Sequence, residues 1–304
     1  MSRPFRFAAV LRMAGSGKAW AEKARRLEDS GFDALLVPDH LVGARFAPVA
    51  ALTAAACATS RLRVGTLVFA NDFRHPAVLA KEAATVDVLS EGRLEFGIGT
   101  GWMARDYAQA GLTLDPPGVR VARLAEAIQV LKGLWRGGRF SYDGEHYTIG
   151  GLEQEPVPVQ RPHPRLMLGG GGPRMLRLAA READIVNLTM RVRPDGSGPD
   201  TADGGPDAFR RKIEIIREAA GPRFGEIELG TSVLRVGAGA DVARWSAANP
   251  SAQIGTPQVL TGDPPQACDE LRHWREEHGI SYYVMHNESD LGAFLPVVRE
   301  LAGS

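Results

Sequence analysis

A carboxylate and an imidazole stand next to each other at Asp39 and His40, directly after the apolar run Leu35-Leu36-Val37-Pro38. Histidine titrates near neutral pH, and an adjacent carboxylate can orient its ring and stabilise its protonated form. The pair therefore has the chemistry of proton transfer. A structural alternative is that Asp39 caps a following turn while His40 packs against the rim of the fold.

Two glycine-rich segments have the composition of phosphate-binding turns. The first, Gly97-Ile98-Gly99-Thr100-Gly101-Trp102, ends an apolar run, and the second, Gly169 to Gly172, precedes Pro173 and a helical segment. Backbone N–H groups can converge on an anion where no Cβ intervenes, and a helix N-terminus adds free donors and a positive dipole end. The two segments therefore predict a phosphorylated cofactor.

Eight short apolar runs alternate with amphipathic segments of helical period along residues 1–304. The runs are centred near residues 8, 35, 66, 96, 167, 186, 232 and 283. Strands that are apolar on both faces are typical of a buried parallel sheet. Eight β-α units without a break in composition favour a single α/β domain, a closed (β/α)8 barrel. The rival is a Rossmann-type domain, whose G-x-G-x-x-G fingerprint follows the first strand, whereas the glycines here have another spacing and follow the fourth.

Two segments interrupt the repeat. We predict an insertion after the fourth strand, over about residues 103–160, that contains a small hairpin turning at Asp143-Gly144. Residues 191–207 are rich in Pro, Asp and Gly without apolar periodicity, which indicates a mobile, solvated loop. Residues 237–265 are irregular and receive no assignment.

In a barrel of this kind, the carboxyl ends of the strands form the reactive face. Several of the predicted strands end in polar or glycyl residues, as a ligand site on that face requires. Among them, Arg12, Arg235 and His286 could bind an anionic group of a substrate, or could equally be paired with carboxylates at the rim. The polar residues at these strand ends are Arg12, Asp39, His40, Asn71, Thr100, Asn187, Arg235 and His286.

The composition excludes several classes of partner. Lys plus Arg and Asp plus Glu both number 36, so the formal net charge is +0 and no overall field favours nucleic acid or anionic lipid. No apolar run approaches the roughly 20 residues needed to span a bilayer. We expect Cys57 and Cys268 to be packing residues in a reducing compartment, which predicts a cytoplasmic protein. No His or Cys stands at metal-ligand spacing, so no metal site is expected.

The chain resembles the luciferase-like monooxygenase superfamily, and within it the branch of oxidoreductases that depend on the deazaflavin coenzyme F420. The resemblance covers essentially the whole chain. The segments that carry it are Gly31 to His40, Arg63 to Val68, His75-Pro76, Asp87 to Leu94 and Gly97 to Trp102.

This resemblance implies a TIM-like barrel with a flavin or deazaflavin across its C-terminal face. It implies a cis peptide between Leu67 and Val68, contact of Asp39 with the cofactor and a proton-transfer role for His40. Sugar-phosphate dehydrogenases of the branch carry a glutamate where this chain has Trp102, so the resemblance does not extend to that reaction. The expected cofactor-binding residues are Asp39, Leu67, Val68, Ala70, Asn71, Thr100, Gly101, Trp102, Gly170, Gly171, Gly172, Pro173 and Met175, and the expected substrate-binding residues are Arg12, Trp102, Asn187, Arg235 and His286.

Three functions follow from these observations. The first is an F420-dependent oxidoreductase that transfers a hydride between the deazaflavin and a small organic substrate. The second is an FMN-dependent monooxygenase on the same barrel, and the third is a flavin-binding protein without turnover. The resemblance also implies a homodimer, for which the small apolar residues from Ala50 to Thr59 are suitable.

Overall fold

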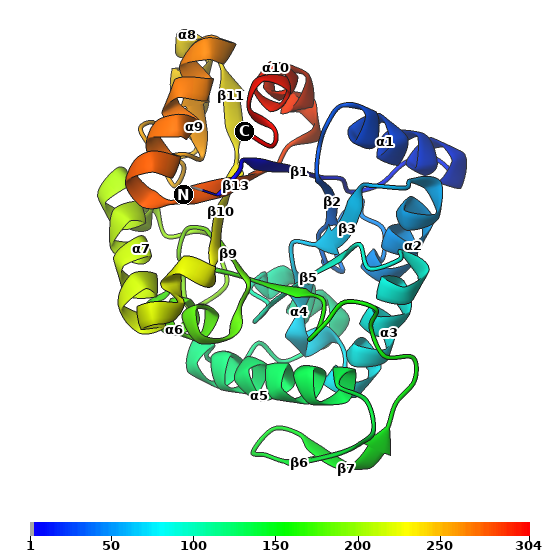
Figure 1. The fold of residues 1–304 in the computed structure, drawn as a ribbon. Coiled ribbons are helices and arrows are strands. Elements are labelled where there is room, and N and C mark those ends of the chain that lie inside the picture. The colour runs from blue at the N-terminus through cyan, green and yellow to red at the C-terminus, as the bar shows by residue number, and fades with distance from the viewer. Residues whose placement is uncertain (1–2) are drawn as a thin grey trace.

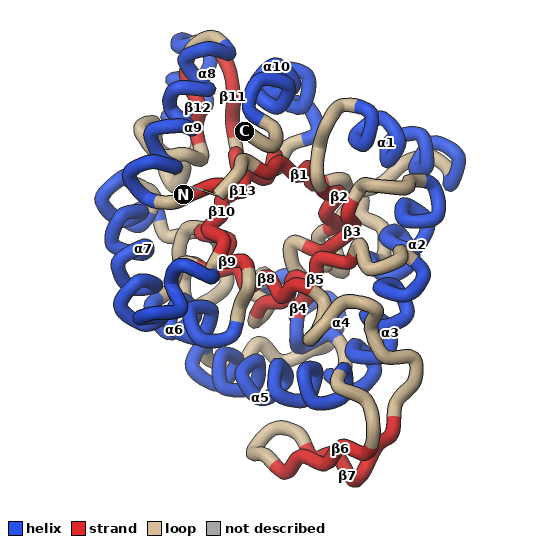
Figure 2. The backbone as a smooth tube through the Cα atoms, in the orientation of Figure 1, coloured by secondary structure: helices blue, strands red, loops and turns tan. Residues whose placement is uncertain are grey.

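The computed structural model describes residues 3–304, and nine of its strands form one closed parallel barrel (Figure 2). The barrel closes because β3 pairs directly with β5, with Val64 opposite Leu94. The predicted (β/α)8 fold is confirmed, and all eight predicted strands are present. Around the ring they are β3 (Arg63–Thr66), β2 (Ala34–Val37), β1 (Arg6–Val10), β13 (Ile280–Met285), β10 (Glu228–Val233), β9 (Ile185–Leu188), β8 (Arg165–Gly170) and β5 (Leu94–Gly99), and β4 (Phe69–Ala70) continues the third strand.

The third strand is broken between β3 and β4 by Leu67 and Val68, and the peptide bond between them is cis, as the family resemblance implies. Beyond this break, β4 pairs with β5 through Phe69 and Ala70. The side chains of Leu67 and Val68 therefore lie at the mouth of the barrel.

An outer ring of helices covers the barrel (Figure 1). The first helix, α1, shows why these segments are helical: Ser16 caps its N-terminus by accepting from Ala19 N, and Trp20, Ala24 and Leu27 share its buried face. Full burial of a large apolar side chain stabilises a fold by about 1.5–3 kcal/mol. The ring consists of α1 (Gly17–Asp29), α2 (Pro48–Ala58), α3 (Pro76–Leu89), α5 (Pro117–Trp135), α6 (Pro173–Glu182), α7 (Pro206–Ala220), α9 (Pro264–His278) and α10 (Leu291–Leu301).

Additional elements lie outside this repeat. The predicted hairpin is present as β6 (Arg139–Asp143) and β7 (Thr148–Glu153), and Gly144 N donates to Tyr147 O in its turn. A short helix, α4 (Ala104–Ala110), follows the fourth barrel strand. The irregular segment 237–265 contains α8 (Gly239–Ala248) and β12 (Val259–Thr261). The strand β12 pairs in parallel with β11 (Arg235–Gly237), which ends where this segment begins.

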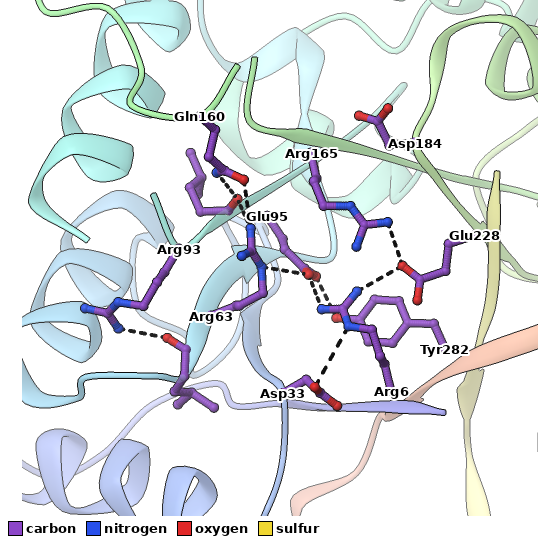
Figure 3. Close-up of polar contacts among 12 residues, drawn as sticks. Arg6, Asp33, Arg63, Arg93, Glu95, Gln160, Arg165, Asp184, Glu228 and Tyr282 are labelled. Atoms are coloured by element: carbon purple, nitrogen blue, oxygen red, sulfur yellow. Dashed lines mark hydrogen bonds and ion pairs between the residues drawn. The ribbon is translucent and has the colours of Figure 1, made fainter. Parts of the chain in front are cut away.

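Ion pairs fill the amino-terminal end of the barrel (Figure 3). The buried carboxylate of Glu95 accepts from Tyr282 Oη at 2.7 Å and pairs with Arg6 and Arg63, while Glu228 pairs with Arg6 at 2.9 Å and Arg165 at 2.8 Å. Burial alone would raise the pKa of Glu95, but the charges of Arg6 and Arg63 lower it below its usual value. The opposite charges at this end of the barrel therefore compensate one another. In TIM barrels the amino-terminal face contributes to stability, whereas the active site lies at the carboxyl-terminal face.

The two cysteines differ in their surroundings. Cys268 on α9 is buried, as expected, but Cys57 on α2 is exposed, so its prediction as a packing residue is wrong. The error arose because the Ala-rich sequence of α2 gives no polar face that would distinguish inside from outside. Within residues 3–304, none of the helices has the length and apolar character needed to traverse a bilayer.

Candidate active site

A cavity of about 1170 Å³ opens at the carboxyl ends of the barrel strands. Its volume exceeds that of a typical small-ligand pocket, which leaves room for both a cofactor and a substrate. Most of the residues predicted for the site are brought together here. Those that line the cavity are Arg12, Asp39, His40, Leu67, Val68, Ala70, Thr100, Gly101, Trp102, Gly170, Gly171, Gly172, Pro173, Met175, Asn187 and His286.

Two of the predicted residues do not line the cavity. Asn71 is buried beside it and donates through Nδ2 to the hydroxyl of Tyr147 at 3.1 Å. Arg235 pairs with Asp290 at 3.1 Å, which is the rim ion pair that the sequence left open as an alternative. Their positions after predicted strands could not reveal these partners, because Tyr147 and Asp290 lie far along the chain.

The carboxylate that orients His40 is Asp106, and the sequence-based expectation that its neighbour Asp39 does so is wrong. His40 Nδ1 lies 2.6 Å from Asp106 Oδ2, while Asp106 Oδ1 accepts from the backbone N–H groups of Leu41 and Val42. An ionised carboxylate only accepts hydrogen bonds, so Nδ1 carries the proton and Nε2 is left for the cavity. Asp106 belongs to α4, so its role depends on the fold and not on sequence proximity.

Asp39 is held by two other groups. Its Oδ2 accepts from Ala70 N at 3.0 Å and from Arg74 Nη1 at 2.6 Å. The predicted structural alternative, a cap on the following turn, is therefore not what Asp39 does. It ties the segment after β2 to Ala70 at the end of β4 and to Arg74 beyond it, and so fixes the relative positions of the strand ends beside Leu67 and Val68.

The glycines of the two segments serve different purposes. A Cβ at Gly97 would overlap Thr66 O, and one at Gly99 would lie 2.8 Å from Val68 Cγ2, so these two glycines make room for the broken third strand. Gly101 adopts φ +71, a conformation that favours glycine, and its carbonyl accepts from Arg120. Thr100 and Gly101, at the end of this segment, both line the cavity.

The second glycine segment leads from β8 into α6, with Gly172 at the N-cap and Pro173 at the first helical position. A Cβ at Gly171 would lie 2.5 Å from Arg191 N and overlap Thr189 O, while the Cβ position of Gly172 is free of neighbours. The first turn of α6 has no side-chain cap, so its N–H groups remain available. This arrangement fits the phosphate of a cofactor.

Apolar side chains line another part of the cavity. Leu67, Val68, Phe69 and Trp102 line the cavity, and the rings of Trp102 and His40 meet edge to face with centroids 5.8 Å apart. Asn187 also lines the cavity, and its Oδ1 is buried without a hydrogen-bond partner among residues 3–304. Such an orphaned acceptor is a position where a ligand donor would be accommodated.

The segment at residues 191–207 contributes part of the cavity wall, although its composition indicates a solvated loop. Val192 and Pro199 form a bridge, Arg191 pairs with Asp200, and Gly196 O accepts from Ala104 N beside Trp102. Its mobility stays a prediction. Its position against α4 places it at the edge of the site, which composition could not reveal.

The charge of the cavity lining is unlike that of the whole chain. Seven arginines but three aspartates line it, although the formal net charge of the protein is +0. The three aspartates are Asp39, Asp106 and Asp200, and they are hydrogen-bonded to the side chains of Arg74, His40 and Arg191, respectively. The cavity therefore favours anionic ligands.

The comparisons with known proteins identify the family of the chain. The family model described as luciferase-like monooxygenase matches residues 4–303, and the chain belongs to that family. At the sequence level it is similar to the F420-dependent glucose-6-phosphate dehydrogenases of Gordonia bronchialis (29% identical, 87% of this chain and 86% of that one) and of Nocardia farcinica (30% identical, 85% and 84%).

Among solved structures, the fold is similar to the coenzyme F420-dependent tetrahydromethanopterin reductase of Methanopyrus kandleri. That match has a TM-score of 0.78 at 19% identity and covers 98% of both chains. Because the identity is low, this likeness concerns the fold, and it extends over the barrel and its insertion.

Proposed function

We propose that this protein is an F420-dependent oxidoreductase that transfers a hydride between the deazaflavin and a small organic substrate. The observation that carries the proposal is that His40, oriented by Asp106, and the glycine turn before α6 line one cavity. The sequence-level similarity to F420-dependent enzymes supports the choice of cofactor.

The residues of the cavity fit such a cofactor. Thr100, Gly101 and the turn from Gly170 to Met175 would hold its phosphate, and Leu67 and Val68 would support one face of its ring system. Coenzyme F420, when bound, supplies a carbon centre that carries a hydride and does not readily activate oxygen. The protein itself then has to orient the substrate, exclude water and manage one proton.

His40 is the group that would accept this proton or return it. Its Nδ1–H is donated to Asp106, so Nε2 can accept a proton from a substrate alcohol or, in the reverse direction, return it. Trp102, in edge contact with His40, places an apolar surface beside the imidazole. Trp102 stands where the sugar-phosphate dehydrogenases of the branch carry a glutamate. We therefore propose that the substrate is not a sugar phosphate whose oxidation depends on that glutamate.

Two other functions compete with this proposal. An FMN-dependent monooxygenase would use the same barrel, and a non-catalytic flavin-binding protein would need the glycine turn but not the His40–Asp106 pair. Fluorescence titration of the purified protein with coenzyme F420 and with FMN distinguishes an F420-dependent enzyme from these two alternatives. We expect saturable binding of F420 and much weaker binding of FMN; tight FMN binding without F420 binding would overturn the proposal.

We further propose that the enzyme is a cytoplasmic homodimer. Ala50, Ala54 and Cys57 are exposed on α2, and Val88 and Leu89 are exposed on the neighbouring α3, so the two helices present a face of small and apolar side chains (Figure 1). Light scattering after gel filtration tests this. We expect a dimer that Ala54→Arg converts to a monomer, and a monomeric wild type would contradict the proposal.

A further inference from the structure

Three cationic or titratable side chains lie on the side of the cavity away from the glycine turn. Arg12 follows β1, Arg45 lies in the loop after β2, and His286 follows β13. The strands β2, β1 and β13 are neighbours in the ring and stand opposite β8 and β5, whose ends carry the glycines (Figure 2). The cavity therefore has an end with arginine side chains that is separate from the glycine turn.

Arg12 has no side-chain carboxylate partner among residues 3–304. The nearest candidate, Glu288, is already engaged: its Oε1 accepts from the backbone N of Arg12 at 3.0 Å, and its Oε2 pairs with Lys23 Nζ at 2.5 Å. The guanidinium of Arg12 thus faces the cavity with its charge uncompensated by a direct ion pair.

Arg45 likewise has no side-chain carboxylate partner among residues 3–304. Its guanidinium donates to the carbonyl of Val42, while its Nε is buried and has no partner within the part of the chain that the structure describes. Burial and the nearby charge of Arg45 lower the pKa of Arg12, against the effect of Glu288. Two neighbouring arginines without an ion pair of their own are unfavourable unless an anion joins them.

His286 completes the group. Its Nδ1 is buried and unpartnered among residues 3–304. Burial first, and then the charges of Arg12, His40 and Arg45, lower its pKa to about 4. His286 is therefore neutral at pH 7 and can donate one N–H to a ligand without adding a third positive charge.

We propose that Arg12, Arg45 and His286 bind an anionic group of the substrate, so that the substrate is an organic carboxylate or phosphate ester. The inference rests on the proposed function, since it names the class of molecule that the hydride-transfer site receives. The anion of the substrate lies at this end of the cavity, the phosphate of the cofactor at the other, and the reacting carbon between them, beside His40. Arg235 has no part in it because Asp290 neutralises its charge.

The test measures binding and not turnover. Acetate and inorganic phosphate serve as probes, titrated calorimetrically into the protein saturated with coenzyme F420, so that the glycine turn is already filled. The variants are Arg12→Gln and Arg45→Gln. The matched control is Arg244→Gln, which removes the same charge from an exposed side chain on α8, 80% accessible and remote from the cavity.

We expect each cavity variant to weaken anion binding by about 10-fold or more, as loss of a charge-assisted hydrogen bond does, while the control and the affinity for F420 stay unchanged. The tighter of the two probes identifies the carboxylate or the phosphate ester as the substrate group. Equal anion affinity in the wild type and both variants would overturn the inference. If F420 fails to bind but anion affinity still depends on Arg12 and Arg45, the proposed function fails and the anion site stands. Should Arg12→Gln not fold, Arg45→Gln alone decides.

Discussion

His40 Nδ1 lies 2.6 Å from Asp106 Oδ2, and this single contact connects the loop after β2 with the short helix α4 that follows β5. The other oxygen of Asp106 accepts from Leu41 N at 3.0 Å and from Val42 N at 2.9 Å. One carboxylate therefore fixes both the imidazole and the backbone that carries it. Asp106 is 1% exposed, so water competes little for these hydrogen bonds.

Substitution of Asp106 tests its positioning role. In Asp106→Asn the side-chain amide can donate to Nδ1, which removes the proton from Nδ1 and places it on Nε2. We expect the rate of hydride transfer to fall roughly 10- to 100-fold and its pH profile to change, while the affinity for F420 is unaffected. Single-turnover kinetics at several pH values measure this. An unchanged pH profile would show that Asp106 only supports the fold.

Removal of the imidazole tests His40 itself. We expect His40→Ala to lower the rate of the proton-coupled step by about 10²- to 10⁴-fold, the range typical of general acid–base groups, with little change in the dissociation constant of F420. Cofactor titration and single-turnover measurements on the same preparation separate the two effects. Transfer at the wild-type rate would refute the proton role of His40 and leave the oxidoreductase proposal intact.

A methyl group at Gly171 tests the glycine turn. The added Cβ would lie 2.5 Å from Arg191 N and overlap Thr189 O, both backbone atoms that cannot rotate away. We expect Gly171→Ala to displace the turn and to weaken F420 binding at least about 10-fold, in the range that mispositioned donors cost. Gly239→Ala at the start of α8, where a Cβ meets nothing within 4 Å, is the control. Equal F420 affinity in both variants would remove the turn from the cofactor site.

The barrel could be predicted from the sequence because eight short, mainly apolar runs alternate with segments of helical period. The cofactor end could also be predicted, since glycines before a helix act through the local backbone. Asp106 and Arg45 could not be found in this way, because their roles depend on contacts between segments after different strands. For the same reason the sequence could not tell that Arg235 is neutralised by Asp290 while Arg12 is not.

A partly buried carboxyl outside the site predicts how stability depends on pH. Burial raises the pKa of Glu270 on α9 to about 7 from its usual 4.5, so the folded state holds a proton that the unfolded state has released between these values. The free energy of unfolding should therefore fall as the pH rises from about 4.5 to 7. We expect Glu270→Gln to be more stable than the wild type at pH 8, by on the order of 1–3 kcal/mol.

Urea unfolding at pH 5 and pH 8 measures this difference. Glu276→Gln, an exposed position on the same helix, is the control and should leave the pH dependence unchanged. If Glu270→Gln and the wild type lose the same stability between the two pH values, Glu270 is not the group responsible.

We propose that one cavity binds coenzyme F420 with its phosphate at the glycine turn, its ring system against Leu67 and Val68, and His40 beside its reactive carbon. A crystal structure of the protein soaked with F420 tests this most directly. We predict density for the phosphate at Gly170 to Gly172 and for the deazaflavin between that turn and His40, with the end at Arg12, Arg45 and His286 left open for substrate. Density for F420 outside this cavity, or with the deazaflavin turned away from His40, would contradict the account.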